Sequence, residues 1–312
     1  ANRFLRQQGR TFTGFSWSPP LPAGAGAADL SQDDERRRIE EARAVEGFPL
    51  RYARLELAHM VAHASRDITL QPASSLMHEL ATSEDAASQG VRTMLSGWGG
   101  DELIGFNGRG YLSGLARGGQ WATLLDEARL FAARHGGSAR SLWLRNVIFP
   151  LLPTFLLGGI FPQEVPPPRP WPDFLRPEFA AALAGVEPLT RPEARERPGV
   201  RRMQIILLQH GHLSYRMETW AARGAEVGVT YAYPLLDRRL VEFALSLPGN
   251  MYYCKGTRRY LFRAALAGIL PDALRANRNK EDPALWQALT GLQKEAGEMI
   301  LSDLRARADN PY

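Results

Sequence analysis

Apolar and polar positions in the first hundred residues predict strands and helices in alternation. Residues 50–57 alternate apolar and polar side chains, which is typical of a half-buried strand. Residues 31–45 are predicted to form a helix with Ser31 as its N-cap. The remaining elements expected here are strands at 11–17 and 91–95, a helix at 74–88 that Gly90 ends, and a helix that ends at Gly9.

This order of strand, helix, strand, helix and strand implies an α/β fold built on a parallel sheet, with a ligand site at the carboxyl ends of the strands. Beyond residue 118 the pattern becomes helical, so we divide the chain into an α/β part, 1–118, and a helical part, 119–312. An apolar stretch interrupted by prolines covers 141–161. Helices are expected at 120–135, 204–224, 238–247 and 257–270, and Asp237 is expected to be the N-cap of the helix at 238–247.

The third predicted strand leads directly into Ser96-Gly97-Trp98-Gly99-Gly100-Asp101-Glu102. Glycines allow backbone N–H groups to approach a phosphate closely, and a helix start adds partial positive charge. A carboxylate beside such a turn can hold the Mg²⁺ that accompanies ATP. The alternative interpretation is an ordinary tight turn in which Asp101 caps a helix.

Composition excludes several classes of protein. Hydrophobic residues make up 45% of the 312 residues, which is enough for a full core, and the net charge of +5 is spread along the chain without a nucleic-acid-binding stripe. The single cysteine, Cys254, excludes an internal disulfide or cysteine metal cluster and fits a cytoplasmic location. No signal peptide is visible, and the most apolar segment, 147–161, is too short for a membrane span.

Four segments, in the expected order, resemble the synthetase domain of the asparagine synthetase family. They are TFTGFSW at 11–17, SGWGGDEL at 96–103, YPLLDRRLVEF at 233–243, and Leu270-Pro271 followed by Arg278 and Lys280. The resemblance extends over nearly the whole chain. It implies an ATP-pyrophosphatase core, similar to the adenine nucleotide alpha hydrolases, with a large C-terminal helical region.

Within that family, the chain is most similar to the macrolactam cyclases of lasso-peptide clusters. Trp98 occupies the position where asparagine synthetases usually have Glu and β-lactam synthetases have Tyr. The segments NGRGY at 107–111, RMETW at 216–220 and KEDP at 280–283 also resemble these cyclases. Two substrates therefore stay open: aspartate with ammonia, giving asparagine, or a precursor peptide, giving a macrolactam.

The resemblance implies an amide-forming reaction in two steps. A carboxylate attacks the α-phosphate of ATP and releases pyrophosphate, and an amine then attacks the acyl-adenylate and releases AMP. By resemblance Ser96 and Gly97, with Gly99 and Gly100, bind the nucleotide, and Asp101 binds Mg²⁺. Lys280 stabilises negative charge on the phosphates or on the tetrahedral intermediate.

The attacking amine needs a base, and the related β-lactam synthetases use a Tyr–Glu pair. Trp98 cannot act as a base, so we expect His212 to do so on chemical type, with Glu218 orienting His212 or the amine. The alternatives are a structural histidine and an ion pair of Glu218 with Arg216 or Arg223.

The family's pyrophosphate-binding motif S-G-G-x-D-S does not occur in these 312 residues, and residue 1 is Ala rather than the catalytic Cys of a glutaminase domain. We therefore expect a fragment that alone binds ATP and Mg²⁺ poorly, or else a non-catalytic binding protein of the family. An unrelated nucleotide-binding protein is disfavoured by the absence of paired cysteines and of a basic RNA face. The expected partners are a small-molecule or peptide carboxylate and a glutaminase domain or leader-peptide-binding protein, without nucleic acid or membrane.

Overall fold

The computed structural model describes residues 2–31, 34–64, 76–135, 138–144, 199–209, 211–277 and 282–306. The chain separates into two compact units. Unit 1 combines 1–98, 211–234 and 263–312, and unit 2 combines 99–210 and 235–262. Each unit is thus assembled from separated stretches of the sequence. The predicted domain boundary between residues 118 and 119 stays a prediction.

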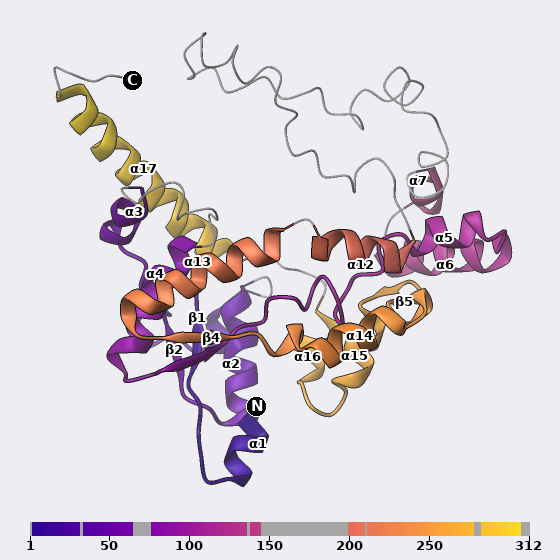
Figure 1. Cartoon of the computed structure of the whole chain (residues 1–312), viewed down its shortest axis with the longest axis horizontal. Helices are drawn as coiled ribbons and strands as arrows, with labels where there is room; N and C mark the ends of the chain where they lie inside the picture. The colour runs from indigo at the N-terminus through magenta and orange to yellow at the C-terminus, as the bar shows by residue number, and fades with distance from the viewer. Residues whose placement is uncertain are drawn as a thin grey trace. The chain divides into compact units, whose positions relative to one another are not determined.

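Unit 1 contains two pairs of parallel strands (Figure 1). Strand β1 (Gly14–Ser16) pairs with β2 (Leu50–Tyr52), and β3 (Thr93–Leu95) pairs with β4 (Thr230–Ala232). The predicted α/β class is confirmed, and the three strands expected in the first hundred residues all form, though each is shorter than predicted. Among the described residues the strands form separate pairs rather than one continuous sheet. The ATP-pyrophosphatase core stays a prediction.

The helices of unit 1 pack around these strands. Helix α4 (Leu76–Ser88) contacts β1 and α13 (His212–Val227), and α13 also packs against β4. Helix α3 (Leu57–Ala64) lies against both α4 and the long C-terminal helix α17 (Pro283–Ala306). The remaining helices of this unit are α1 (Asn2–Gln7), η1 (Ala27–Asp29), α2 (Glu35–Glu46) and α16 (Asp272–Ala276).

Helix α2 begins later than the sequence suggested. Asp34, and not Ser31, is the N-cap, because its Oδ1 accepts a hydrogen bond from the Arg36 N–H at 2.9 Å. The same carboxylate is bound by the Arg36 guanidinium at 2.7 Å, and both side chains are largely buried. The ion pair lowers the pKa of Asp34, mainly through the hydrogen bond from Arg36.

The helix predicted over 204–224 is two helices. Helix α12 (Val200–Gln209) belongs to unit 2, whereas α13 begins at His212 in unit 1. Gly211 is the N-cap of α13 and has a φ of 78°, a left-handed conformation that glycine adopts at little cost. A continuous helix through Gly211 is therefore wrong.

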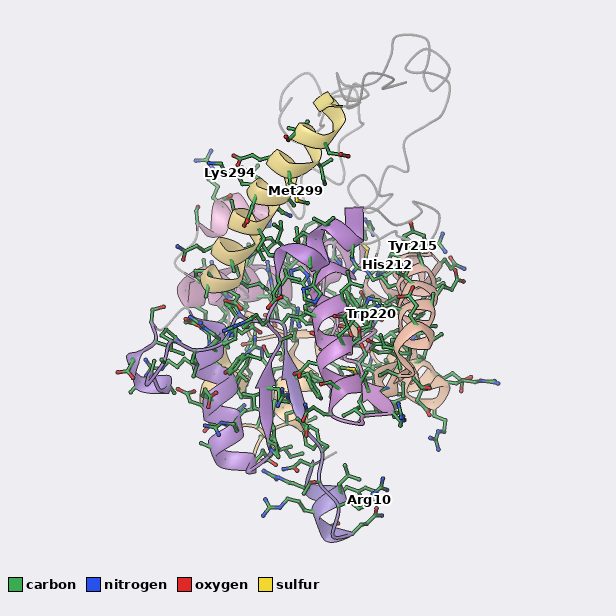
Figure 2. All side chains as sticks on the ribbon, turned by 90° about the vertical axis from the view of Figure 1, so that its left-hand side faces the viewer. Arg10, His212, Tyr215, Trp220, Lys294 and Met299 are labelled. Carbon is green, nitrogen blue, oxygen red and sulfur yellow. The ribbon has the colours of Figure 1, made fainter. Side chains whose placement is uncertain are left out.

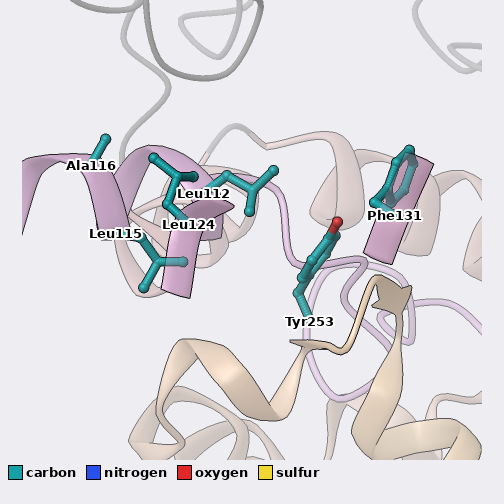
Figure 3. Close-up of a cluster of buried hydrophobic side chains, with 6 residues drawn as sticks. All are labelled: Leu112, Leu115, Ala116, Leu124, Phe131 and Tyr253. Atoms are coloured by element: carbon teal, nitrogen blue, oxygen red, sulfur yellow. The ribbon is translucent and has the colours of Figure 1, made fainter. Parts of the chain in front are cut away.

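Unit 2 is mainly helical. Its helices are α5 (Tyr111–Arg117), α6 (Trp121–His135), α7 (Ala139–Trp143), α12 and α14 (Arg238–Ser246), with the short η5 (Gly249–Met251). One core cluster joins α5, α6 and the strand β5 (Tyr253–Cys254), as Figure 3 shows; its members are Leu112, Leu115, Ala116, Leu124, Phe131 and Tyr253. A second cluster consists of Phe106, Val200, Met203, Leu207 and Tyr252.

The helix predicted over 257–270 begins instead as a strand. Strand β6 (Thr257–Arg258) pairs with β5 in an antiparallel hairpin, and α15 (Tyr260–Ala265) follows. Lys255 and Gly256 form the turn with φ values of 49° and 69°, as expected for a tight hairpin turn. Glu127 on α6 accepts both of their backbone N–H groups, at 2.9 and 2.7 Å.

The remaining turn, η4 (Pro234–Leu236), leads into α14, whose N-cap is Asp237 as predicted. Within the described ranges, none of the helices has both the length and the apolar content that a bilayer-crossing segment needs.

Candidate functional site

The glycine-rich segment begins where the third predicted strand ends, at the carboxyl end of β3. The Ser96 N–H donates to the Ala232 carbonyl at 2.9 Å, which extends the pairing of β3 with β4 by one residue. The Ser96 Oγ accepts from the Trp98 N–H at 3.3 Å and so holds the start of a turn. A Cβ built on Gly97 meets no atom within 4 Å. The open backbone lies at the carboxyl end of a parallel strand, which is where ligands bind in α/β sheets, and nucleotide binding by Ser96 and Gly97 stays a prediction.

No helix begins at Asp101, so both the helix start expected beside the glycine-rich turn and the alternative of Asp101 as a helix cap are wrong. Residues 98–105 form consecutive turns, in which the Gly105 N–H donates to the Gly100 carbonyl at 2.8 Å. Gly99 has a φ of 89°, and a Cβ there would lie 2.2 Å from the Leu236 Cδ2. Gly99 is thus required for packing in unit 2, and a nucleotide contact from Gly99 or Gly100 stays a prediction.

Asp101 is bound by an arginine. Its Oδ1 lies 2.5 Å from the Arg259 Nη1, and its Oδ2 lies 3.1 Å from Nη2, in a bidentate pair. About half of the Asp101 side chain is exposed. Nothing in the sequence singles out Arg259 as its partner.

This arrangement does not fit Mg²⁺ as it stands. Both Asp101 oxygens accept N–H groups, and the adjacent guanidinium charge repels a dication. Among the described residues, no group of three or more His, Cys, Asp or Glu side chains is placed to hold a metal ion. The metal role of Asp101 stays a prediction, and no step below depends on it.

Trp98 belongs to an aromatic cluster in unit 1. Its ring lies edge to face with Trp220, with 5.6 Å between the ring centroids, and Trp220 contacts Trp17 in the same manner at 5.8 Å. The Arg216 guanidinium carbon lies over the Trp98 ring, 4.2 Å from its centroid. Trp98, in the turn after Ser96, is therefore held by packing on α13. The sequence analysis did not predict that Arg216 or Trp17 takes part in this packing.

His212 is the first residue of α13, as Figure 2 shows with its label and that of Trp220 further along the helix. Arg216 and Trp220 follow at intervals of four residues, so the three side chains share one face of the helix. This is the face that contacts Trp98. His212 thus shares the face of α13 on which Arg216 and Trp220 contact Trp98, and its role as a base stays a prediction.

Glu218 does not share that face. Six residues separate it from His212, which turns the side chains about 120° apart around the helix axis. Glu218 is exposed, and Arg223 binds Glu84 at 2.5 Å and Glu226 at 2.8 Å. A role of Glu218 in orienting His212 or an amine stays a prediction without support from this geometry.

Glu79 on α4 is a buried carboxyl group that the sequence analysis missed. It is 2% exposed and accepts hydrogen bonds from the Trp17 Nε1–H at 2.9 Å and from the Tyr231 hydroxyl. Burial raises the pKa of Glu79 to about 7, and these donors together with Arg223 oppose that rise only in part. Burial and the neighbouring Glu79 also raise the pKa of Tyr231. No motif marks Glu79, because its partners come from distant parts of the chain.

Lys280 lies outside the described residues, as does Arg278. The described chain resumes at Asp282, which is 3% exposed and accepts a hydrogen bond from the Ser18 hydroxyl at 2.6 Å. The other Asp282 oxygen accepts from the Leu285 N–H at 3.1 Å, at the start of α17. Asp282 therefore fixes the start of α17 to the segment that contains Ser18, within unit 1.

Comparison with protein families gives a match over most of the chain. The family model described as asparagine synthase matches residues 31–310. No curated protein and no solved structure matches.

Proposed function

This chain belongs to the asparagine synthase family, and we propose that it is a ligase that joins a carboxylate to an amine with consumption of ATP. The observation that carries the proposal is the extent of the family match. It includes the turn after β3, the segment that leads into α14, and Lys280.

In the first step, a carboxylate oxygen attacks the α-phosphorus of ATP, and the bond from that phosphorus to pyrophosphate breaks. Ser96 and Gly97, with Gly99 and Gly100, bind the nucleotide, and Lys280 neutralises charge that develops on the phosphates. The open backbone at Gly97 supports this assignment, because a phosphate or ribose can approach there without meeting a side chain.

In the second step, the amine nitrogen attacks the carbonyl carbon of the acyl-adenylate, and AMP leaves with the bridging oxygen. His212 accepts the proton that the amine loses. Its position on the face of α13 that contacts Trp98 supports this role.

A peptide is the substrate that the surroundings of Trp98 favour. The half-buried indole carries no charge, and Arg216 lies over its outer ring face. An apolar ring beside a guanidinium suits a larger acceptor that bears a carboxylate. Free aspartate suits this site less well, because it also carries an ammonium group. Macrolactam formation is accordingly preferred to asparagine formation.

The test is product analysis with the full-length gene product, ATP and Mg²⁺. One arm contains aspartate and ammonium, and the other contains a peptide with a free amine and an acidic side chain. We expect AMP and pyrophosphate in equal amounts in the peptide arm. Production in the aspartate arm alone would support the ligase but contradict the peptide preference.

The matched variants are Asp101→Asn and Asp126→Asn. Asp101→Asn is expected to abolish pyrophosphate formation, because an amide cannot keep the bidentate pair with Arg259 that lies next to the proposed nucleotide-binding residues Gly99 and Gly100. The circular dichroism spectrum should stay unchanged, because the pair is half exposed. Asp126→Asn, which alters an exposed ion pair with Arg129 on α6, is expected to retain pyrophosphate formation. Absence of carboxylate-dependent ATP turnover in both arms would contradict the ligase and favour a non-catalytic binding protein.

A further inference from the structure

Unit 2 contains an open pocket of about 370 Å³, a volume within the range of small-molecule sites. All of its lining residues belong to unit 2, and none lies in the segment from Ser96 to Asp101. They come from α5, from Gln120 just before α6, from the start of α12, and from the turn that joins α14 to η5.

Glycines create much of this space. Four lining positions are glycines, and a Cβ built on Gly114 or Gly199 meets no atom within 4 Å. At Gly249 a Cβ would lie 3.0 Å from the Tyr111 Cδ2 and 3.2 Å from the Val200 Cγ2, so glycine is what allows this turn to lie against them. The pocket wall is therefore partly bare backbone, which offers polar groups to a ligand without side-chain bulk.

The side chains that complete the wall are apolar and firmly packed. Val200 and Leu115 are 7% and 5% exposed, and each belongs to a core cluster of unit 2. Tyr111 packs against both of these clusters. A wall built on core residues is preformed, so a ligand loses little free energy in ordering it.

The charged side chains known to line the pocket are positive. Arg201 and Arg202 line it and are exposed, and among the described residues that line it none is acidic. The Arg201 Nη2 lies 3.4 Å from the Ser246 carbonyl, which keeps this side chain near the turn after α14. Because α12 begins at Val200, the partial positive charge of the helix start acts in the same direction.

We propose that this pocket binds a small organic acid that has an apolar body and a single carboxylate. The apolar wall takes the body, and Arg201 and Arg202 take the carboxylate. The volume matches a small molecule. The site needs neither ATP nor the proposed ligase activity.

The probe is phenylbutyrate, titrated into the whole chain without ATP and followed by calorimetry. Phenylbutylamine serves as the matched ligand of opposite charge. We expect saturable binding of the acid, with an affinity at least about tenfold higher than that of the amine. The double variant Arg201→Gln, Arg202→Gln should remove this preference. Equal affinities, no saturable binding of the acid, or tighter binding of a peptide that ends in phenylalanine would overturn the proposal.

A second variant tests the location. Gly114→Leu adds a side chain at a lining position that no atom blocks, and leucine is favoured over glycine in a helix. We expect this variant to fold and to lose phenylbutyrate binding. Gly291→Leu on α17, where a Cβ also meets no atom within 4 Å, is the control that should bind normally. Unchanged binding by Gly114→Leu would show that the pocket is not the site.

Discussion

At the scale of single residues, Glu79 is an acidic side chain in a buried environment, with an exposure of 2%. A carboxylate is costly to bury, and Glu79 meets this cost with hydrogen bonds from Trp17 and Tyr231 and with a pKa raised to about 7. The group is thus poised between two charge states near neutral pH. Its hydrogen bond from Trp17 connects Glu79 to the aromatic cluster that includes Trp220 and Trp98.

The stability of the fold should therefore depend on pH through Glu79. The pKa of about 7 in the folded protein lies above the usual glutamate pKa of 4.5, so the unfolded chain releases this proton first as the pH rises. The stability of the wild type relative to Glu79→Gln should fall between about pH 4.5 and pH 7, by a few kcal/mol, and then level off.

Urea unfolding across this pH range measures that difference. Glu242→Gln, which removes an exposed carboxylate on α14, is the control that should follow the wild type. A difference between wild type and Glu79→Gln that is constant or increases with pH would contradict the account of Glu79.

His212 should act only in the second step of the proposed reaction. His212→Ala is expected to slow amide formation by about 10²–10⁴-fold and to leave ATP–pyrophosphate exchange nearly unchanged, because adenylation needs no base at the amine. Rapid-quench assays of both steps make the comparison, with His135→Ala on α6 as the control. If exchange and amide formation fell equally, His212 would not be the base.

At this scale, the sequence could predict contacts between residues that are close together in the chain, but not contacts between residues that are far apart in it. Asp237 was identified as an N-cap because its partner is the Arg239 N–H, two residues away. The pairing of Asp101 with Arg259 spans 158 residues, and Glu79 meets Tyr231 across 152. No local pattern records such contacts, because they exist only after the chain has folded.

At the scale of elements, several helices and the strands β1, β2 and β3 formed where the sequence pattern predicted them, whereas the helix α17 and the strands β4 and β6 were not predicted. Helices α4, α6 and α14 lie within a few residues of their predicted ranges, since several turns of apolar spacing define each one. Strands β4 and β6, of three and two residues, are too short to show a period. Their partners in β3 and β5 define them instead.

The break between α12 and α13 depends on the conformation of Gly211. Gly211→Ala should destabilise the protein by about 1 kcal/mol, because alanine is disfavoured at a φ of 78°. Gly114→Ala, inside α5, should instead stabilise it by about 0.5–1 kcal/mol. Chemical unfolding midpoints compare the two, and a stabilising Gly211→Ala would contradict the helix break.

The hairpin of β5 and β6 depends on one carboxylate of α6. Glu127→Gln should destabilise unit 2 by about 1–3 kcal/mol, because an amide oxygen replaces only one of the two acceptors for the Lys255 and Gly256 N–H groups. Hydrogen exchange at these two amides gives the readout. The neighbouring Asp126→Asn should leave their exchange unchanged, and equal effects of the two variants would contradict this assignment.

At the scale of the whole molecule, the sequence predicted the class and the family but not the assembly. The α/β class followed from alternating patterns, and four motif segments pointed to the family that matches residues 31–310. The two compact units each combine distant stretches, with Met94 opposite Tyr231 in the strand pair of unit 1. Such pairing is set by tertiary packing rather than by neighbours in the chain.

The central claim is that a carboxylate is activated by transfer to the α-phosphate of ATP. The most direct measurement supplies the full-length gene product with a peptide whose acidic side chain carries ¹⁸O and analyses the AMP by mass spectrometry. The account predicts AMP that contains one ¹⁸O atom, because the bridging oxygen comes from the carboxylate. AMP without the label, or ADP and phosphate in its place, would contradict it.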